Sequence, residues 1–254
     1  SAGGDIFNFL MKYEGVSFPE AVQMVARQYG IPLPTSSMRP AQREQVSERE
    51  QLLSGNRKVL EFFKKTLASS SGAEARQYLN RRKIHQDLID TFDLGFARPG
   101  WDNLIRYLNR LRVPAQLAEK AGLIVPKKGA GHYDRFRNRI IFPIRDITGQ
   151  VIGFGGRVMD DAKPKYLNSP ETPVYNKRSA LYGLNAAKEK SRTEGCVFIV
   201  EGYFDLLAMH QHGIQNAVAT LGTALTREHI RRLSRAIGSG DKKAVLVFDS
   251  DEAG

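Results

Sequence analysis

The spacing of apolar residues predicts two short helices at the start of the chain. Apolar positions recur every three or four residues over residues 5–13 and again from Phe18 to Tyr29, which is the period of an amphipathic helix. Ser17 and Glu20 form the capping-box pattern that begins the second helix. Two helices of this size bury too little apolar surface to fold alone, so we expect them to be the end of a longer domain.

A polar stretch separates these helices from a long helical region. Residues 34–50 contain proline and serine and almost no large apolar side chain, so we expect a linker that is helical in part over residues 44–50. Residues 51–125 are predicted to be mostly helical, with a break at residues 99–100. Trp101, which follows the break, is expected to anchor the core, with stacking on a nucleobase as the alternative.

The pattern changes to strands at about residue 133. Residues 140–144 and 151–154 are apolar runs on either side of a turn at residues 146–149, which predicts a strand, a turn and a second strand. Residues 164–184 are rich in proline, asparagine, serine and tyrosine and are expected to form an ordered loop.

The last third of the chain predicts a parallel sheet. Apolar runs at residues 197–200, 216–220 and 244–248 alternate with predicted helices, a pattern typical of parallel strands joined by right-handed crossovers. The expected fold class is therefore α/β, with an α+β N-terminal subdomain followed by part of a parallel α/β sheet. A three-stranded parallel sheet with an open edge is unusual as a finished domain, so we expect a chain cut at both ends.

Composition narrows the class of partner. The chain carries 38 Lys and Arg against 27 Asp and Glu, a net charge of +11, which favours nucleic acid first and a membrane surface second. No run approaches the roughly 18 apolar residues of a spanning helix, and the first residues do not form a signal peptide. The single cysteine, Cys196, excludes an internal disulfide and a cysteine-rich zinc site within the chain. A cytoplasmic protein is expected.

Acidic residues follow two of the predicted parallel strands. Glu201 comes directly after the first strand, and Asp249 and Asp251 follow the third. The carboxyl ends of parallel strands share one edge of a sheet, so these carboxylates are expected to gather there. Hard oxygen ligands at this spacing suit Mg²⁺ or Mn²⁺, which assist phosphoryl transfer. Solvated acids or helix caps are the alternative.

Basic residues are dense between residues 132 and 178, which hold nine Lys or Arg against five acids. Arg135, Arg137 and Arg139 alternate, so on a strand they would share one face that suits the phosphate backbone of nucleic acid. A solvated face is the alternative. A second basic set on the predicted helix from residue 226 is interpreted as an exposed face: Arg227, Arg231, Arg232 and Arg235.

Several motifs resemble a known family. The sequence E-G-Y-F-D at residues 201–205, D-S-D-E-A-G at residues 249–254 and Gly222–Thr226 between them resemble a Toprim domain. Topoisomerases, some nucleases and recombination proteins share that domain, but the rest of the chain is similar to the bacterial DnaG-type replicative primases. This likeness covers essentially all 254 residues and is carried by residues 3–7, 14–18, 133–146, 153–157, 165–172, 175–177 and 181–184.

The resemblance implies an activity and its residues. It implies a DNA-dependent RNA polymerase that makes short RNA primers on single-stranded DNA at replication forks, as part of a primosome, by metal-dependent nucleotidyl transfer. The implied catalytic residues are Glu201, Asp249 and Asp251, which with Asp205 would hold Mg²⁺ or Mn²⁺. The implied nucleotide-binding residues are Lys165, Tyr166, Asn168 and Lys177. The expected nucleic-acid-binding residues are Arg82, Arg135, Arg137, Arg157, Lys165 and Lys177.

The resemblance also implies a domain order and partners. We expect the helical tail of a zinc-binding domain at 1–34, a linker at 35–50, the basic N-terminal subdomain of the polymerase core at 51–190 and an incomplete Toprim domain at 191–254. Zinc would belong to the part before Ser1, and a replicative helicase would bind a C-terminal domain beyond Gly254. The expected partners are a single-stranded DNA template and ribonucleoside triphosphates, and the expected state is a monomer without membrane contact.

Two alternatives remain open. A Toprim topoisomerase or nuclease would cleave DNA, and a topoisomerase needs a tyrosine that becomes joined to it. Tyr133 and Tyr175 are available, but nothing in the neighbouring sequence activates them. A non-catalytic module that only holds single strands is the second alternative.

Overall fold

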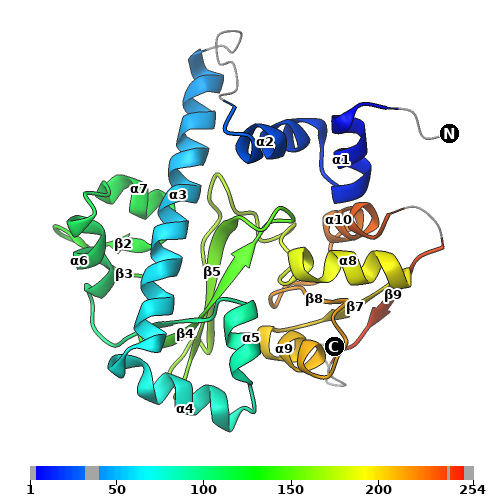
Figure 1. The fold of residues 1–254 in the computed structure, drawn as a ribbon. Coiled ribbons are helices and arrows are strands. Elements are labelled where there is room, and N and C mark those ends of the chain that lie inside the picture. The colour runs from blue at the N-terminus through cyan, green and yellow to red at the C-terminus, as the bar shows by residue number, and fades with distance from the viewer. Residues whose placement is uncertain (1–3, 32–39, 239–240, 249–254) are drawn as a thin grey trace. The chain divides into compact units, whose positions relative to one another are not determined.

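The computed structural model describes residues 4–31, 40–238 and 241–248 of the chain (Figure 1). The two predicted N-terminal helices are confirmed as α1 (Ile6–Glu14) and α2 (Phe18–Gln28). The expected capping contact begins α2, since the Ser17 amide donates to Oε2 of Glu20 at 2.8 Å. Over the described ranges, no helix has the length and apolar character needed to cross a membrane.

The long helix α3 (Pro40–Ala68) starts earlier than the sequence pattern indicates. Residues 40–50, expected to be mostly linker, are helical, while residues 32–39 lie outside the described part. Proline is well accommodated in the first turn of a helix, because its missing amide would have no partner there. The residues that follow it include many strong helix formers. The boundary expected at residue 51 therefore falls inside one continuous helix.

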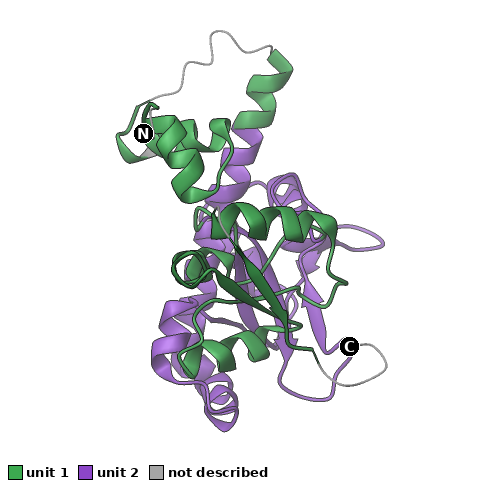
Figure 2. Cartoon of the chain, turned by 90° about the vertical axis from the view of Figure 1, so that its right-hand side faces the viewer, with its two compact units in different colours: residues 1–46, 145–149, 178–254 green, residues 47–144, 150–177 purple. Residues whose placement is uncertain are grey.

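Two compact units divide the chain, with residues 1–46, 145–149 and 178–254 in unit 1 and residues 47–144 and 150–177 in unit 2 (Figure 2). Unit 2 is built on the four-stranded sheet β1-β4-β5-β6, in which β1 pairs with β4 and β5 with β6 in antiparallel fashion. The strands of this sheet are β1 (Gly95–Ala97), β4 (Arg139–Arg145), β5 (Val151–Val158) and β6 (Tyr166–Asn168). The predicted strand-turn-strand is thus confirmed, but β6 lies where a loop was expected.

The rest of unit 2 is mainly helical and surrounds an aromatic core. Phe63 of α3 packs edge-on against Phe154 and Phe136, with ring centroids 5.6 and 6.5 Å apart. A small antiparallel ladder of β2 (Ile124–Pro126) and β3 (His132–Asp134) stands apart from the main sheet. The short helices are η1 (Ser70–Gly72), α4 (Ala73–Arg81), α5 (Gln86–Thr91), α6 (Asn103–Arg110) and α7 (Ala115–Lys120).

Unit 1 contains the predicted parallel sheet. Its strand order is β8-β7-β9, and both pairings are parallel. Figure 1 shows α8 and α10 on one face of this sheet and α9 on the other. The elements are α8 (Leu184–Glu194), β7 (Cys196–Val200), α9 (Tyr203–Gln211), β8 (Ala217–Ala219), α10 (Arg227–Ile237) and β9 (Lys243–Leu246). The expected α/β fold class is therefore confirmed.

Candidate metal site and nucleic-acid interface

The carboxyl edge of the parallel sheet is organised around Glu201. The Glu201 carbonyl oxygen accepts a hydrogen bond from the Gly222 amide at 3.3 Å, which ties the loop after β8 to the end of β7. On the other side, the register pairs Ile199 with Leu246, so Phe248 stands level with Glu201. Two neighbouring strands therefore end beside this carboxylate, as the crossover pattern predicts.

A cavity of about 400 Å³ opens at this edge. The acidic side chains Glu201 and Asp205 line it together with the apolar side chains of Val247 and Phe248. Glu201 is half-buried and Asp205 is exposed. Carboxylate oxygens are the donors that Mg²⁺ and Mn²⁺ prefer, so the donor set of this cavity fits such an ion.

Asp205 also caps the helix that follows Glu201. It is the third residue of α9, and its Oδ2 accepts a hydrogen bond from the Gly202 amide at 3.0 Å. Gly202 is suited to this close approach, since a Cβ there would lie 2.9 Å from that oxygen. The helix-cap alternative therefore applies to Asp205, and its role as a metal ligand stays a prediction.

Asp249 and Asp251 lie outside the described residues. Among the residues that are described, no group of three or more His, Cys, Asp or Glu side chains could hold a metal ion. Glu201 and Asp205 are thus the described members of the predicted four-carboxylate site.

The predicted row of arginines on one strand face is wrong. β3 ends at Asp134 and β4 begins at Arg139, and Asn138 between them adopts a left-handed conformation with φ of 49°. The chain therefore turns between Arg135 and Arg139, and period-two alternation does not apply. The three arginines lie close together around one cavity, but they do not form a row on one strand.

The guanidinium groups instead hold the β6 hairpin. Arg135 Nη2 donates to the Asn168 carbonyl at 3.1 Å, and Arg139 Nη2 donates to the Pro164 carbonyl at 2.8 Å. Arg139 is buried, and burial lowers the pKa of its guanidinium, with the Arg137 charge lowering that pKa further and Asp160 opposing both.

These arginines line a cavity of about 260 Å³ that also contains Lys163 and Asp160. The cationic lining residues are Arg135, Arg137, Arg139 and Lys163, and the acidic lining residue is Asp160. Excess positive charge in a small cavity attracts an anion such as a phosphate group.

Trp101 is an exposed aromatic platform, for which the sequence favoured a place in the core over base stacking. The expectation that Trp101 anchors the core is wrong, because 62% of its surface is exposed. Tyr133 packs edge-on against it with ring centroids 5.6 Å apart, and the Arg137 guanidinium carbon lies 4.3 Å from its ring centroid. A fixed, exposed indole beside an arginine can stack on a nucleobase. The break at residues 99–100 is the sequence signal that could have suggested exposure.

Buried Asp134 holds this platform in place. Its two carboxylate oxygens accept from the amides of Leu104 at 2.7 Å and Ile105 at 3.0 Å, and its own amide donates to the Trp101 carbonyl at 2.7 Å. Burial raises the pKa of Asp134, although these helix amides act in the opposite direction. Asp134 thus caps α6, while Asp102, at the cap position, makes no capping hydrogen bond with its side chain.

Asp134→Ala is expected to lower the free energy of unfolding by about 2–3 kcal/mol, because two buried helix amides lose a charged acceptor. Denaturant unfolding followed by the fluorescence of the single tryptophan and by circular dichroism measures this change. Asp102→Ala, which removes an exposed ion pair with Arg106, should change the same free energy by less than about 0.5 kcal/mol. Equal losses in the two variants would contradict the assignment of Asp134 as the clamp.

A second cluster brings together three of the predicted site residues. The Tyr78 hydroxyl accepts hydrogen bonds from Nε of Arg82 at 2.8 Å and from Nε of Arg157 at 2.7 Å. The Arg157 guanidinium carbon lies 4.8 Å from the Tyr166 ring centroid. Burial alone would lower the pKa of Arg157, but the Tyr78 hydrogen bond and the two tyrosines give a net increase. Tyr78 was not predicted, because it lies far from Arg157 in sequence.

The remaining nucleotide-binding candidates lie on or beside β6. Its register pairs Tyr166 with Arg157 and Asn168 with Gly155. Lys165 is exposed just before this strand, and Lys177 is half-buried with its amide donating to Oε1 of Glu171 at 2.9 Å. The structure thus places Lys165, Tyr166 and Asn168 along one hairpin, and their binding roles stay predictions.

Of the two tyrosines considered for a topoisomerase, Tyr175 is poorly suited to attack DNA. Tyr175 is 1% exposed, and burial raises the pKa of its hydroxyl. The guanidinium carbon of Arg137 lies 5.1 Å from the ring centroid of Tyr133. Among the described contacts of Tyr133, no base that would activate its hydroxyl is present.

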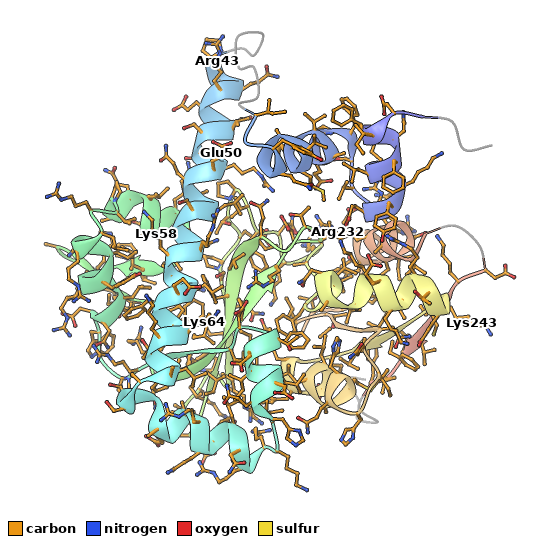
Figure 3. All side chains as sticks on the ribbon, viewed as in Figure 1. Arg43, Glu50, Lys58, Lys64, Arg232 and Lys243 are labelled. Atoms are coloured by element: carbon orange, nitrogen blue, oxygen red, sulfur yellow. The ribbon has the colours of Figure 1, made fainter. Side chains whose placement is uncertain are left out.

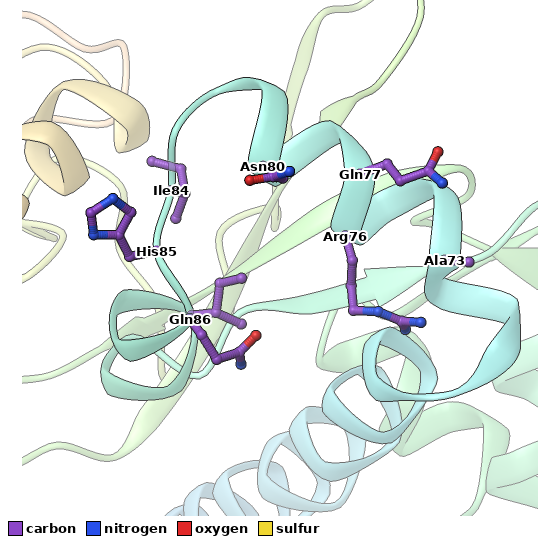
Figure 4. Close-up of a pocket in the computed structure, with 8 residues that line it drawn as sticks. Ala73, Arg76, Gln77, Asn80, Ile84, His85 and Gln86 are labelled. Atoms are coloured by element: carbon purple, nitrogen blue, oxygen red, sulfur yellow. The ribbon is translucent and has the colours of Figure 1, made fainter.

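A further cavity, of about 470 Å³, lies between α4 and α5 (Figure 4). Its lining includes Gln77, Asn80 and His85, and none of the predicted site residues belongs to it. Arg76, also in the lining, donates to the Ser69 carbonyl at 2.7 Å and so serves the end of α3. We assign no ligand to this cavity.

Comparison with known proteins gives matches over most of the chain. Residues 62–188 match the family model of the N-terminal domain of the DNA primase catalytic core, and residues 195–254 match that of the Toprim domain. A DNA primase from Pseudomonas putida is 42% identical over 255 residues, covering 100% of this chain and 38% of the relative. The chain thus spans about 38% of the length of that curated relative.

Solved structures give the same likeness. The RNA polymerase domain of Mycobacterium tuberculosis primase DnaG is 38% identical with a TM-score of 0.75, covering 81% of this chain and 68% of that one. A DnaG primase catalytic domain bound to single-stranded DNA is 40% identical with a TM-score of 0.74, covering 82% of this chain and 64% of that one.

Proposed function

Because the chain belongs to the DnaG-type DNA primase family, we propose that it is part of an RNA polymerase that copies single-stranded DNA into short RNA primers at replication forks. The observation that carries this proposal is the half-buried carboxylate of Glu201 at the carboxyl end of a parallel strand, in a chain whose other unit has a cavity lined by four cationic side chains. A similar catalytic domain has been solved with single-stranded DNA.

The proposed reaction joins a 3′-hydroxyl to the α-phosphorus of a ribonucleoside triphosphate and releases pyrophosphate. Glu201, Asp249 and Asp251, with Asp205 in support, would hold Mg²⁺ or Mn²⁺. A divalent ion supplies charge neutralisation for the attacking oxygen and for the leaving pyrophosphate. The apolar side chains of Val247 and Phe248 line the same cavity as the Glu201 carboxylate.

The side chains on and beside β6 would bind the incoming nucleotide. Lys165 and Lys177 offset the charge of the triphosphate, and Asn168 donates to a phosphate or ribose oxygen. Tyr166 is 38% exposed and stacks on Arg157, so its ring can contact a sugar or base while the guanidinium fixes its position. These roles are those that the family resemblance implies, and the position of Lys165, Tyr166 and Asn168 along one hairpin supports them.

The template would be held by the arginines and by Trp101. Arg82 is exposed and offers its positive charge to the phosphate backbone, while Arg157, which is buried, shares the Tyr78 hydroxyl with it and adds positive charge behind it. Arg135 and Arg137 line the second basic cavity. Trp101 stacks on a base, which only an unpaired strand can offer without first opening a duplex.

The wider setting follows from the family. We propose the domain order expected from the sequence, with boundaries near residues 34 and 190 and with the continuous helix α3 in place of a boundary near residue 50. We also propose a cytoplasmic monomer that depends on a zinc-binding domain and a helicase-binding domain in the complete protein. The nucleic-acid partner is the single-stranded template, and the small-molecule substrates are ribonucleoside triphosphates.

Tyr78→Phe is expected to weaken single-stranded DNA binding by roughly 3–10-fold, because Arg82 and Arg157 lose the shared acceptor that orients them. Fluorescence anisotropy of a labelled oligonucleotide measures the change. Tyr29→Phe, the same deletion on an exposed tyrosine of the other unit, should leave the affinity unaltered. If Tyr78→Phe binds as tightly as the wild-type chain, the shared hydroxyl does not organise the site.

The test of the proposed function is incubation of the chain with labelled single-stranded DNA, ribonucleoside triphosphates and Mn²⁺. Template-dependent RNA products support a primase. Cleaved strands, or strands covalently attached to the protein, would favour a Toprim nuclease or topoisomerase. Tight strand binding without Mn²⁺ binding, measured by calorimetry, would favour a non-catalytic module.

A further inference from the structure

Helix α10 carries a regular stripe of arginines that the proposed function does not use. Its buried side chains are His229, Leu233, Ala236 and Ile237. Arg227, Arg231 and Arg235 follow one another at intervals of four residues on the opposite side, and all three are exposed. Residues four apart on a helix have Cβ atoms roughly 5–6 Å apart on one face, so their guanidinium groups form a row directed away from the core.

This row is poorly neutralised. Glu228 is the acidic residue of α10, and its carboxylate is shared by Arg231 at 3.5 Å and Arg232 at 3.9 Å. Within the described part of the chain, Arg227 and Arg235 have no ion-pair partner. Figure 3 shows Arg232 on this helix and Lys243 at the start of β9. α10 carries four arginines and one glutamate, so its arginine side chains repel one another. An anion bound along the helix would reduce this repulsion.

Other cations of unit 1 differ from this row because they are engaged within the protein. Lys188 pairs with Glu14, and both side chains are largely buried. The Arg192 guanidinium lies over the Tyr13 ring and donates to the Ala236 carbonyl at 3.3 Å. These two cations fasten α1 to the helical layer, whereas the α10 row faces solvent.

The row also begins at the candidate metal edge. The loop after β8 is bonded to Glu201 through the Gly222 amide, and Thr226, four residues later, caps α10 by accepting from the His229 amide at 3.1 Å. From there the helix extends for about 16 Å. Arg227 is thus the end of the row nearest the carboxylate edge, and Arg235 is the far end.

We propose that Arg227, Arg231 and Arg235 bind the phosphate backbone of nucleic acid and guide a strand toward or away from the Glu201 edge. Evenly spaced guanidinium groups match a polymer with a regularly repeated anion. Ile230 is the large apolar side chain exposed on this helix, so among the described residues of α10 the exposed face is dominated by charge. The inference rests on the proposed function in taking nucleic acid as the ligand.

The test compares single-strand binding by the chain and its triple variant Arg227→Gln, Arg231→Gln, Arg235→Gln. With an oligonucleotide on the order of 30 nucleotides, longer than one stacking platform accommodates, the variant should bind about tenfold more weakly at low salt. Its slope of log affinity against log salt should be less steep by about 2, since each lost phosphate contact on a single strand removes roughly 0.7.

A charge-matched control removes three exposed cations of α3 by Arg57→Gln, Lys58→Gln and Lys65→Gln. If this control and the α10 variant lose the same affinity and slope, or if neither loses any, the row is not a binding face. A protection assay provides a second test, in which the α10 arginines are chemically modified in the presence of the oligonucleotide or of an acidic peptide. If the peptide protects them and the oligonucleotide does not, the row is not a binding face for nucleic acid. Failure of the wild-type chain to bind DNA would overturn the proposed function itself, so the two failures are distinguishable. Circular dichroism of both variants should match the wild type.

Discussion

Replacing Glu201 by glutamine is expected to weaken Mn²⁺ binding by at least about tenfold, as loss of groups at a metal site typically does. The amide keeps the shape of the side chain but removes its negative charge. The backbone of Glu201 is held by the Gly222 amide, and the side chain is half-buried beside an open cavity, so the fold should be retained. Isothermal calorimetry with Mn²⁺ measures the affinity, and circular dichroism verifies the fold.

The matched control is Glu189→Gln, which makes the same chemical change at a side chain that is 59% exposed on α8. It should bind Mn²⁺ as the wild type does. Asp249→Asn is expected to behave like Glu201→Gln. If Glu201→Gln and Asp249→Asn both bind Mn²⁺ with wild-type affinity, the carboxyl edge of the sheet is not the metal site.

Trp101→Ala is expected to weaken single-stranded DNA binding by about 1–2 kcal/mol, or roughly 5–30-fold, because one stacked base loses its aromatic partner. The indole is exposed, and Asp134 fixes the backbone that carries it, so little of the loss should come from unfolding. Anisotropy of a labelled oligonucleotide provides the measurement. In the wild-type chain, quenching of the single tryptophan on titration with DNA should report the same event.

Trp101→Phe should recover most of the affinity, because it restores an aromatic face. Tyr29→Ala, which deletes a side chain that is 69% exposed in the other unit, should have no effect on binding. Duplex binding should change little in Trp101→Ala, since paired bases are not available for stacking. An alanine variant that binds single strands with wild-type affinity would show that Trp101 is no platform.

Local pattern was sufficient for the parallel sheet and the N-terminal helices. Continuous apolar runs such as residues 197–200 have few structural solutions when helices separate them, and the crossover rule then fixes which strand ends meet. The sequence alone therefore predicts that Glu201 lies at the carboxyl edge. Its neighbour Asp205 could not be assigned, because a helix cap and a metal ligand use the same residue type.

The basic interface depended on features that a local pattern does not contain. The left-handed φ of Asn138 interrupts the alternation of Arg135 and Arg139, and nothing in their spacing indicates it. Tyr78 meets Arg157 across 79 positions of sequence, so their contact arises only from the packing of α4 against the sheet. The Trp101 carbonyl accepts a hydrogen bond from the amide of Asp134, which is also distant in sequence. The positions of these arginine and aromatic side chains thus depend on contacts between residues far apart in sequence, which the composition of the chain does not reveal.

If the carboxyl edge of the parallel sheet holds a catalytic divalent ion, that ion should be visible in crystals of the chain soaked with Mn²⁺ and a ribonucleoside triphosphate. With diffraction recorded at the manganese edge, we expect an anomalous peak within coordination distance of Glu201 and of Asp249 or Asp251. A map with the triphosphate bound but no manganese at Glu201, or with the ion held elsewhere on the protein, would exclude this edge as the metal site.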